Sequence, residues 1–128
     1  MSLSFCGENS NFCVAVTGEP DWEIVYIDLI RMKIIGSLKI REQIDMINVN
    51  PKQIDQITII QGEKIRSFRS KEDTIIAQTN FSNLTSNSKF TNFAWFDQNT
   101  LIVVNKSGEI FVILKNDLRQ VIKTEYSA

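Results

Sequence analysis

Histidine is absent from this 128-residue sequence. Its absence removes the commonest general base, the commonest zinc ligand and every histidine-dependent catalytic triad. The two cysteines, Cys6 and Cys13, cannot complete a zinc-binding set by themselves. We expect both thiols to be reduced and structural, as in an intracellular protein, with a disulfide between them as the alternative. The sequence therefore predicts no metal site and no catalytic residue.

The sequence also contains few glycines, and its basic and acidic residues are nearly equal in number. Five glycines are scattered singly, so the chain has no glycine-rich loop for a phosphate-bearing cofactor. Fourteen basic residues are balanced by fifteen acidic ones, which argues against a nucleic-acid or anionic-membrane surface. Uncharged apolar runs stay below the ~18 residues of a membrane span, and residues 1–10 do not resemble a signal peptide. We expect an intracellular protein with no cofactor, no nucleic-acid partner and no membrane partner.

Short apolar runs rich in Ile, Val and Phe are abundant, and turn residues bound each of them. This composition is typical of β-strands, and none of the runs shows the 3.6-residue periodicity of a helix. We predict an all-β chain of eleven or twelve short strands. The expected strands lie near residues 3–5, 11–17, 22–28, 32–39, 43–49, 54–61, 63–69, 73–79, 90–96, 99–105, 108–114 and 118–124.

Three Gly-Glu dipeptides indicate an internal repeat. Gly18, Gly62 and Gly108 are each followed by Glu and each separate two apolar runs, at spacings of 44 and 46 residues. A period of ~45 residues with four strands per unit is typical of the blades of a β-propeller. Glycine at such a hairpin supplies the positive φ that a tight β-turn demands. Runs such as "TLIVV" are apolar throughout because neighbouring blades cover both faces of a blade.

The repeat predicts about three four-stranded blades, 1–41, 42–80 and 88–126, which together make a partial propeller. The polar stretch 79–89 is predicted to be a surface loop. Closed propellers have ~4–8 blades, so each end blade is expected to expose an apolar face. We expect these faces to include Val14, Val16, Ile24 and Tyr26 at one end, and Ile102, Val104, Phe111 and Ile113 at the other. Such faces predict a homo-oligomer, pairing with the remaining blades of a propeller, or a longer polypeptide.

The series of runs resembles WD40 repeats. Val49-Asn50-Pro51 lies where such repeats carry Ser-Pro before their second strand, and Tyr26-Ile27-Asp28 lies where they end the third strand with Trp-Asp. The chain departs from the pattern because it has no Gly-His dipeptide. Arg69 and Lys115 replace the terminal Asp in the other two blades. The hydrogen-bonded His–Asp network of ordinary WD40 blades therefore cannot form here.

A narrower resemblance rests on "TGEPDWEIVYIDLIRMKII", 17–35, and "FAWFDQNTLIVVNKSGEIFVI", 93–113. Both segments are similar to the propeller region of the cilia- and flagella-associated protein 57 family of axonemal WD-repeat proteins, and the Pro-Asp-Trp turn is the specific part. The resemblance covers most of residues 3–120. It implies a non-enzymatic protein–protein interaction scaffold of the axoneme, associated with inner dynein arms. The alternative is a general intracellular WD40 interaction module without a ciliary role.

The first hairpin contains the first candidate residues. Gly18, Pro20 and Asp21 are predicted to make the turn, in which Pro20 fixes φ and Asp21 bonds the backbone. Gly62 and Gly108 are predicted to do the same for the later hairpins. Trp22 then starts a strand. Trp22 either packs over its own blade or anchors a partner protein, because tryptophan is enriched at interface hot spots.

The remaining candidates for partner binding are Arg66, Phe68 and Arg69, in the basic stretch "KIRSFRSK". Phosphoinositide-binding propellers use a Phe-Arg-Arg-Gly loop, whereas the matching stretch here is Phe68-Arg69-Ser70-Lys71, without the second Arg and the Gly. We therefore favour a strand edge protected by charged side chains over a lipid or nucleic-acid site.

Overall fold

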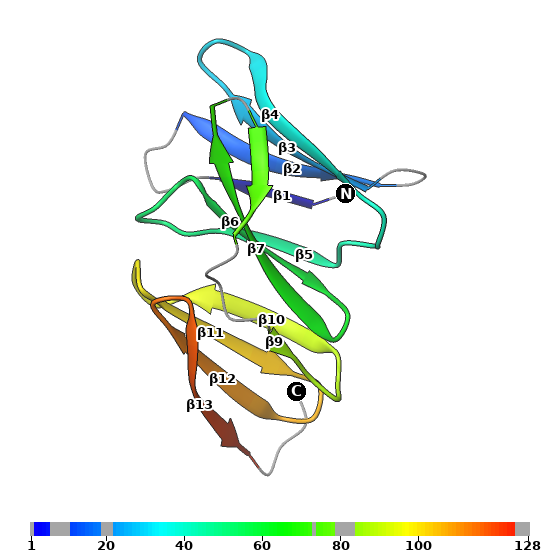
Figure 1. Ribbon diagram of the computed structural model, residues 1–128, viewed down its shortest axis with the longest axis vertical. Helices are drawn as coiled ribbons and strands as arrows, with labels where there is room; N and C mark the ends of the chain where they lie inside the picture. The colour runs from blue at the N-terminus through cyan, green and yellow to red at the C-terminus, as the bar shows by residue number, and fades with distance from the viewer. Residues whose placement is uncertain (1, 6–10, 19–21, 73, 79–83, 125–128) are drawn as a thin grey trace.

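The computed structural model describes residues 2–5, 11–18, 22–72, 74–78 and 84–124. Over these residues the chain forms thirteen β-strands and no helix (Figure 1). The described residues accordingly contain no helix with the length and hydropathy needed to cross a membrane. The prediction of an all-β fold is confirmed.

The strands form three antiparallel sheets. In each sheet, strands that follow one another in the sequence are neighbours, except that β9 pairs with β7 and not with β8. The first sheet contains β1 (Ser2–Phe5), β2 (Phe12–Thr17), β3 (Trp22–Asp28) and β4 (Lys33–Ile40). The second contains β5 (Met46–Val49), β6 (Gln56–Gln61), β7 (Lys64–Lys71), β8 (Thr74–Ala77) and β9 (Leu84–Thr85). The third contains β10 (Phe90–Trp95), β11 (Thr100–Asn105), β12 (Glu109–Leu114) and β13 (Asp117–Lys123).

The three sheets are arranged as propeller blades. The first strands of the sheets contact one another, β1 against β5 and β5 against β10, and the last strands of the first two sheets, β4 and β8, are also in contact. Each sheet therefore presents a face to its neighbour, and the three follow one another along the longest axis of the molecule (Figure 1). The structure confirms the prediction of about three four-stranded blades.

One part of the prediction for the segment between the second and third blades is wrong. The polar stretch 79–89, expected to be a loop, contains the strand β9, which pairs with Lys64 and Ile65 of β7. β8 pairs with β7 only from Phe68 to Lys71. The fourth position of the second sheet is thus filled by two short strands. Leu84 explains the return to the sheet, because its side chain is buried in the core shared with the third sheet.

Two hydrophobic cores hold the sheets together, and the middle sheet contributes to both. In β6, Ile57 and Ile59 face the first sheet, whereas Ile60 faces the third. All six residues of β6 are buried, because a sheet inside a propeller is covered on both faces. Full burial of an aliphatic or aromatic side chain stabilises a fold by about 1.5–3 kcal/mol, so these two cores are the main source of cohesion.

The expected composition of the uncovered faces is wrong for six of eight residues. Val14, Val16, Ile24 and Tyr26 lie in the core between the first and second sheets. Phe111 and Ile113 lie in the core between the second and third sheets. Ile102 and Val104 alternate with the buried residues of β11 and are half-exposed, as expected for the outward face. Successive residues of a strand point to opposite faces, and runs that are apolar at every position do not show which set points inward.

Two of the three predicted hairpin glycines have positive φ. Gly62, at 64°, lies in a two-residue turn closed by the pair Gln61 and Lys64. Its amide donates to Asp45 Oδ2 at 2.7 Å. Gly108 has a φ of 83°. Gly18 is not among the residues with positive φ, and Pro20 and Asp21 lie outside the described residues.

The glycine hairpins differ in how they should tolerate a side chain. Gly62→Val and Gly108→Val should each lower the free energy of unfolding by roughly 1–3 kcal/mol, because a β-branched residue resists the left-handed backbone conformation. At Gly62 an added Cβ meets no atom within 4 Å, so the loss would report backbone strain alone. The matched control is Gly18→Val, where the Cβ also meets nothing within 4 Å and φ is not positive. We expect Gly18→Val to unfold near the wild-type urea midpoint and Gly62→Val to unfold at a lower one. If both variants unfold at the wild-type midpoint, the assignment of Gly62 as a required hairpin glycine is contradicted.

Candidate functional site

A cluster of buried polar side chains joins the second and third blades. Gln56 is 2% exposed, and its Nε2 lies 3.0 Å from both Gln78 Oε1 and Asn116 Oδ1. Its Oε1 accepts a hydrogen bond from Asn50 Nδ2 at 3.0 Å. Asn50 also donates to the Gln98 carbonyl at 2.8 Å, and Ser67 Oγ donates to Gln78 at 2.6 Å. The cluster therefore fastens the turns around β11 and β12 to the middle sheet.

This cluster contains amides and a hydroxyl but no group that titrates near neutral pH. No set of three or more His, Cys, Asp or Glu side chains that could hold a metal ion occurs in the described residues. Burial raises the pKa of the Cys13 thiol, which keeps it protonated. The Asn99 amide, followed by the Thr100 hydroxyl, lowers the pKa of Asp97, whose carboxylate accepts these hydrogen bonds. Both shifts have local structural causes.

Short polar side chains organise two of the turns in a comparable way. Asp28 ends β3, and its Oδ1 accepts hydrogen bonds from the amides of Ile30 and Arg31 at 3.0 and 3.1 Å. Asn105 ends β11, and its Oδ1 accepts from the amides of Ser107 and Glu109 at 3.1 and 2.9 Å. Both are buried. The resemblance to WD40 repeats pointed to Asp28 as the terminal Asp of a strand, but the sequence analysis did not identify Asn105.

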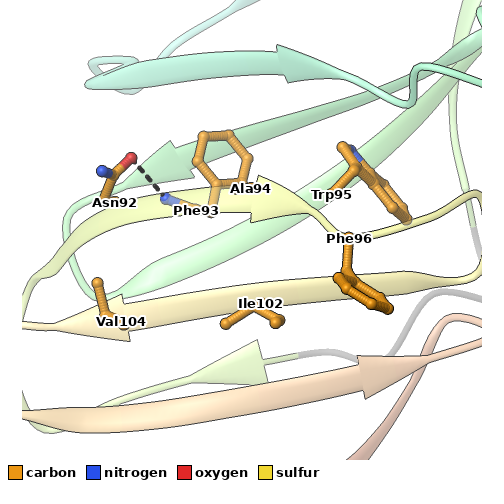
Figure 2. Close-up of a pocket in the computed structure, with 7 residues that line it drawn as sticks. All are labelled: Asn92, Phe93, Ala94, Trp95, Phe96, Ile102 and Val104. Carbon is orange, nitrogen blue, oxygen red and sulfur yellow. Dashed lines mark hydrogen bonds between the residues drawn. The ribbon is translucent and has the colours of Figure 1, made fainter.

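The outward face of the third sheet contains an apolar hollow of about 350 Å³, which we call the open-face hollow. It is lined by Asn92, Phe93, Ala94, Trp95, Phe96, Ile102 and Val104. In Figure 2 the rings of Phe93 and Trp95 lie on one side of β10, and the Phe96 ring lies on the other side, near Ile102. Phe93 and Trp95 pack with the core shared with the second sheet, whereas Phe96 is 77% exposed. The hollow therefore presents an aromatic ring and two aliphatic side chains to solvent.

A second depression, which we call the rim groove, runs between the last strands of the first two sheets. It has a volume of about 520 Å³. Its lining comes from β4 and the residues after it, from β7 and from β8. The lining residues are Leu38, Lys39, Ile40, Arg41, Glu42, Arg66, Phe68, Ile75, Ile76 and Ala77. The groove thus combines an apolar floor with several charged side chains.

The structure brings three of the four candidate partner-binding residues close to the rim groove. Arg66 and Phe68 line it, and Trp22 pairs with Ile40, another lining residue. Trp22 is half-buried against the first core, which is compatible with packing over its own blade. Arg69 faces the opposite side of the second sheet and pairs with Asp55 at 3.6 Å. No pattern in the sequence indicated that β4 and the residues after it share this groove.

The comparisons with known proteins identify an architecture but no family. No family model matches the chain, and no curated protein matches it by sequence. The β-propeller domain of Cps50 (Swd1) from Myceliophteria thermophila superposes with a TM-score of 0.80 at 14% identity, covering 98% of this chain and 42% of that one. A functionally unknown protein from Desulfotomaculum acetoxidans superposes with a TM-score of 0.77 at 18% identity, covering 95% of this chain and 42% of that one.

Identities this low show the fold alone. The chain has the fold of a partial β-propeller, and it spans less than half the length of each of the two solved chains described above. Neither solved structure links it to the axonemal WD-repeat proteins in particular.

The Gln56 cluster should contribute measurably to stability. Gln56→Leu keeps the side-chain volume similar but removes one of the two acceptors of the fully buried Asn50 Nδ2, and it removes the donor to Asn116 Oδ1. An unsatisfied buried polar group costs about 1–3 kcal/mol, so the urea midpoint should fall accordingly. The control is Gln120→Leu, a fully analogous change at an exposed position of β13, which should alter stability by less than about 0.5 kcal/mol. Equal midpoints for the two variants would show that the cluster does not join the blades.

Proposed function

We propose that this chain is a non-catalytic protein–protein interaction scaffold. The observation that carries the proposal is the outward face of the third sheet. Ile102 pairs with Val112 in register, and Val104 pairs with Ile110, so the four side chains share one face. All four are half-exposed, and the open-face hollow lies beside them. Contiguous exposed apolar surface of this kind marks an interaction site.

The chemistry of this face suits another β-sheet. The opposite face of the same sheet packs its buried aliphatic and aromatic residues against the second sheet, and the outward face offers side chains of the same type. A further blade, from a second copy or from the rest of a propeller, would bury them in the same way. Two copies supply about six blades in all, a number within the ~4–8 of closed propellers.

The resemblance of residues 17–35 and 93–113 supports a finer proposal, that the scaffold is intracellular and acts in the ciliary or flagellar axoneme with proteins associated with the inner dynein arms. This part rests on the sequence resemblance alone. A general intracellular interaction module without a ciliary role is the alternative, and it rests on the propeller fold alone.

The scaffold proposal predicts that the purified chain associates through the third sheet. In sedimentation velocity at low micromolar concentration, the wild-type chain should form species larger than a monomer, because the apolar face is otherwise left in water. Ile102→Glu and Val104→Glu should shift the distribution to the monomer. Ile30→Glu, which changes a 71% exposed residue in the β3–β4 turn, serves as the control and should behave like the wild type. A wild-type monomer that binds no hydrophobic dye would contradict the proposal.

The axonemal proposal predicts where the native protein is found. Immunoblots of detergent-extracted axonemes from the source organism should retain the chain, and extraction conditions that release inner dynein arms should release it too. A cytosolic protein of comparable abundance serves as the control for trapping. Detection only in the soluble fraction of the cell body would leave the general interaction module as the remaining function.

A further inference from the structure

The rim groove lies apart from the open-face hollow, at the contact between β4 and β8. Its volume of about 520 Å³ falls in the range of roughly 300–1,000 Å³ that is usual for ligand pockets. Leu38, Ile40, Phe68 and Ile75 form its floor, and all four pack in or against the core of the first two sheets. A rigid apolar floor of this kind can receive an apolar side chain from a partner.

The charged side chains that line the rim groove differ in whether they have an ionic partner. Glu42 is bound by Lys64, whose Nζ lies 3.0 and 3.3 Å from its two carboxylate oxygens. Within the described part of the chain, Arg41 and Arg66 take part in none of the ion pairs. The carboxylate of the groove is therefore neutralised, and the two guanidinium groups remain available. The rim is complementary to a ligand that carries negative charge.

Arg66 is oriented before any ligand arrives. Its guanidinium carbon lies 4.9 Å from the centroid of the Phe68 ring, and Phe68 is only 1% exposed. A guanidinium held over the face of a fixed ring has fewer accessible orientations than a free side chain. Such a group binds a carboxylate through two parallel hydrogen bonds. Arg66 thus contacts the Phe68 ring and can still bind a carboxylate through two hydrogen bonds.

We propose that the rim groove binds an acidic peptide segment of a partner protein. An aliphatic or aromatic side chain of the segment contacts the floor, and its carboxylates bind Arg66 and Arg41. The inference rests on the proposed scaffold function, for which it names the chemistry of one partner and a second surface separate from the third sheet.

The charge count favours a peptide over a membrane. Anionic lipid surfaces are recognised by clusters of ~4–8 Lys and Arg. The rim groove offers Arg41, Arg66 and Lys39, and Lys39 lies directly opposite Glu23 in the register of β3 and β4. The chain as a whole has a formal charge of −1. Two unpaired arginines above an apolar floor suit one or two carboxylates, and they are too few for a lipid surface.

Fluorescence anisotropy with two labelled peptides tests the inference on the whole 128-residue chain. The acidic probe is Glu-Leu-Asp-Leu-Glu-Leu, and its uncharged counterpart carries Gln and Asn in place of Glu and Asp. The acidic probe should bind at least about tenfold more tightly, because charge-assisted hydrogen bonds carry the difference. Arg66→Gln should weaken its binding about tenfold, Arg41→Gln should weaken it measurably, and Arg66→Lys should fall between Arg66→Gln and the wild type.

The matched control is Arg119→Gln, an exposed arginine on β13 of the third sheet, which should leave binding of the acidic probe unchanged. Urea midpoints of every variant establish that the fold is retained, and Arg41 is exposed, so its variant remains informative if Arg66→Gln loses stability. Equal weakening by all three Arg→Gln changes would show diffuse charge attraction and would overturn the inference. So would the absence of binding to the acidic probe.

Co-sedimentation with vesicles that contain a phosphatidylinositol phosphate addresses the other anionic partner. Binding that depends on Arg66, in the absence of peptide binding, would assign the groove to a lipid and overturn the inference. The two proposals fail separately. If the chain does not bind the acidic peptide but still associates through Ile102, the scaffold proposal stands and the groove inference fails. If the chain binds the peptide but never associates, only the proposed role of the third sheet is refuted.

Discussion

The burial of one strand on both of its faces is the constraint on which the rest of the structure depends. β6 lies in the middle of the molecule, and its alternate residues belong to two different cores. Ile57 and Ile59 join the second sheet to the first, and Ile60 joins it to the third. Gln56, at the start of the same strand, supplies the polar connection to the third blade. β6 therefore contributes to both interfaces, as does its neighbour β7 through Phe68 and Ile65, and each of the outer sheets depends on this middle sheet for its position.

The local features of the fold could be predicted because they depend on neighbouring residues. The strands follow from short Ile- and Val-rich runs, and the division into blades follows from the recurring Gly-Glu hairpins. Gly62 and Gly108 adopt the positive φ that a tight turn requires, and no tertiary contact is needed to explain it. The turn between β12 and β13 shows the limit of this reasoning. Lys115 and Asn116 both have positive φ, at 51° and 70°, in a hairpin without glycine.

The features that depend on distant parts of the chain could not be predicted. Which alternate residues of β2 and β12 face inward is decided by the sheet that packs against them, and the sequence of an apolar run does not reveal it. The pairing of β9 with β7 depends on Leu84 reaching a core most of whose members lie in the third sheet. The sequence did not indicate that Gln56 is buried between two blades, because a polar residue at the start of an apolar run ordinarily marks a turn. The rim groove exists because β4 and β8 meet, although 33 residues separate the end of β4 from the start of β8.

The two ends of the molecule are not equivalent, and this difference decides where a further sheet should dock. On the first sheet, Cys13 and Val25 point away from the second sheet, since they alternate with residues of the first core, yet they are only 4% and 6% exposed. On the third sheet, the corresponding outward residues Ile102 and Val104 are half-exposed and border a hollow. An apolar side chain that the first sheet does expose, Ile34 at 63%, lies on its edge strand β4, whereas Ile102 and Val104 lie on an inner strand of the third sheet. Association driven by the hydrophobic effect should accordingly begin there, while the rim groove, on the outer edge of the first two sheets, stays accessible to a second partner.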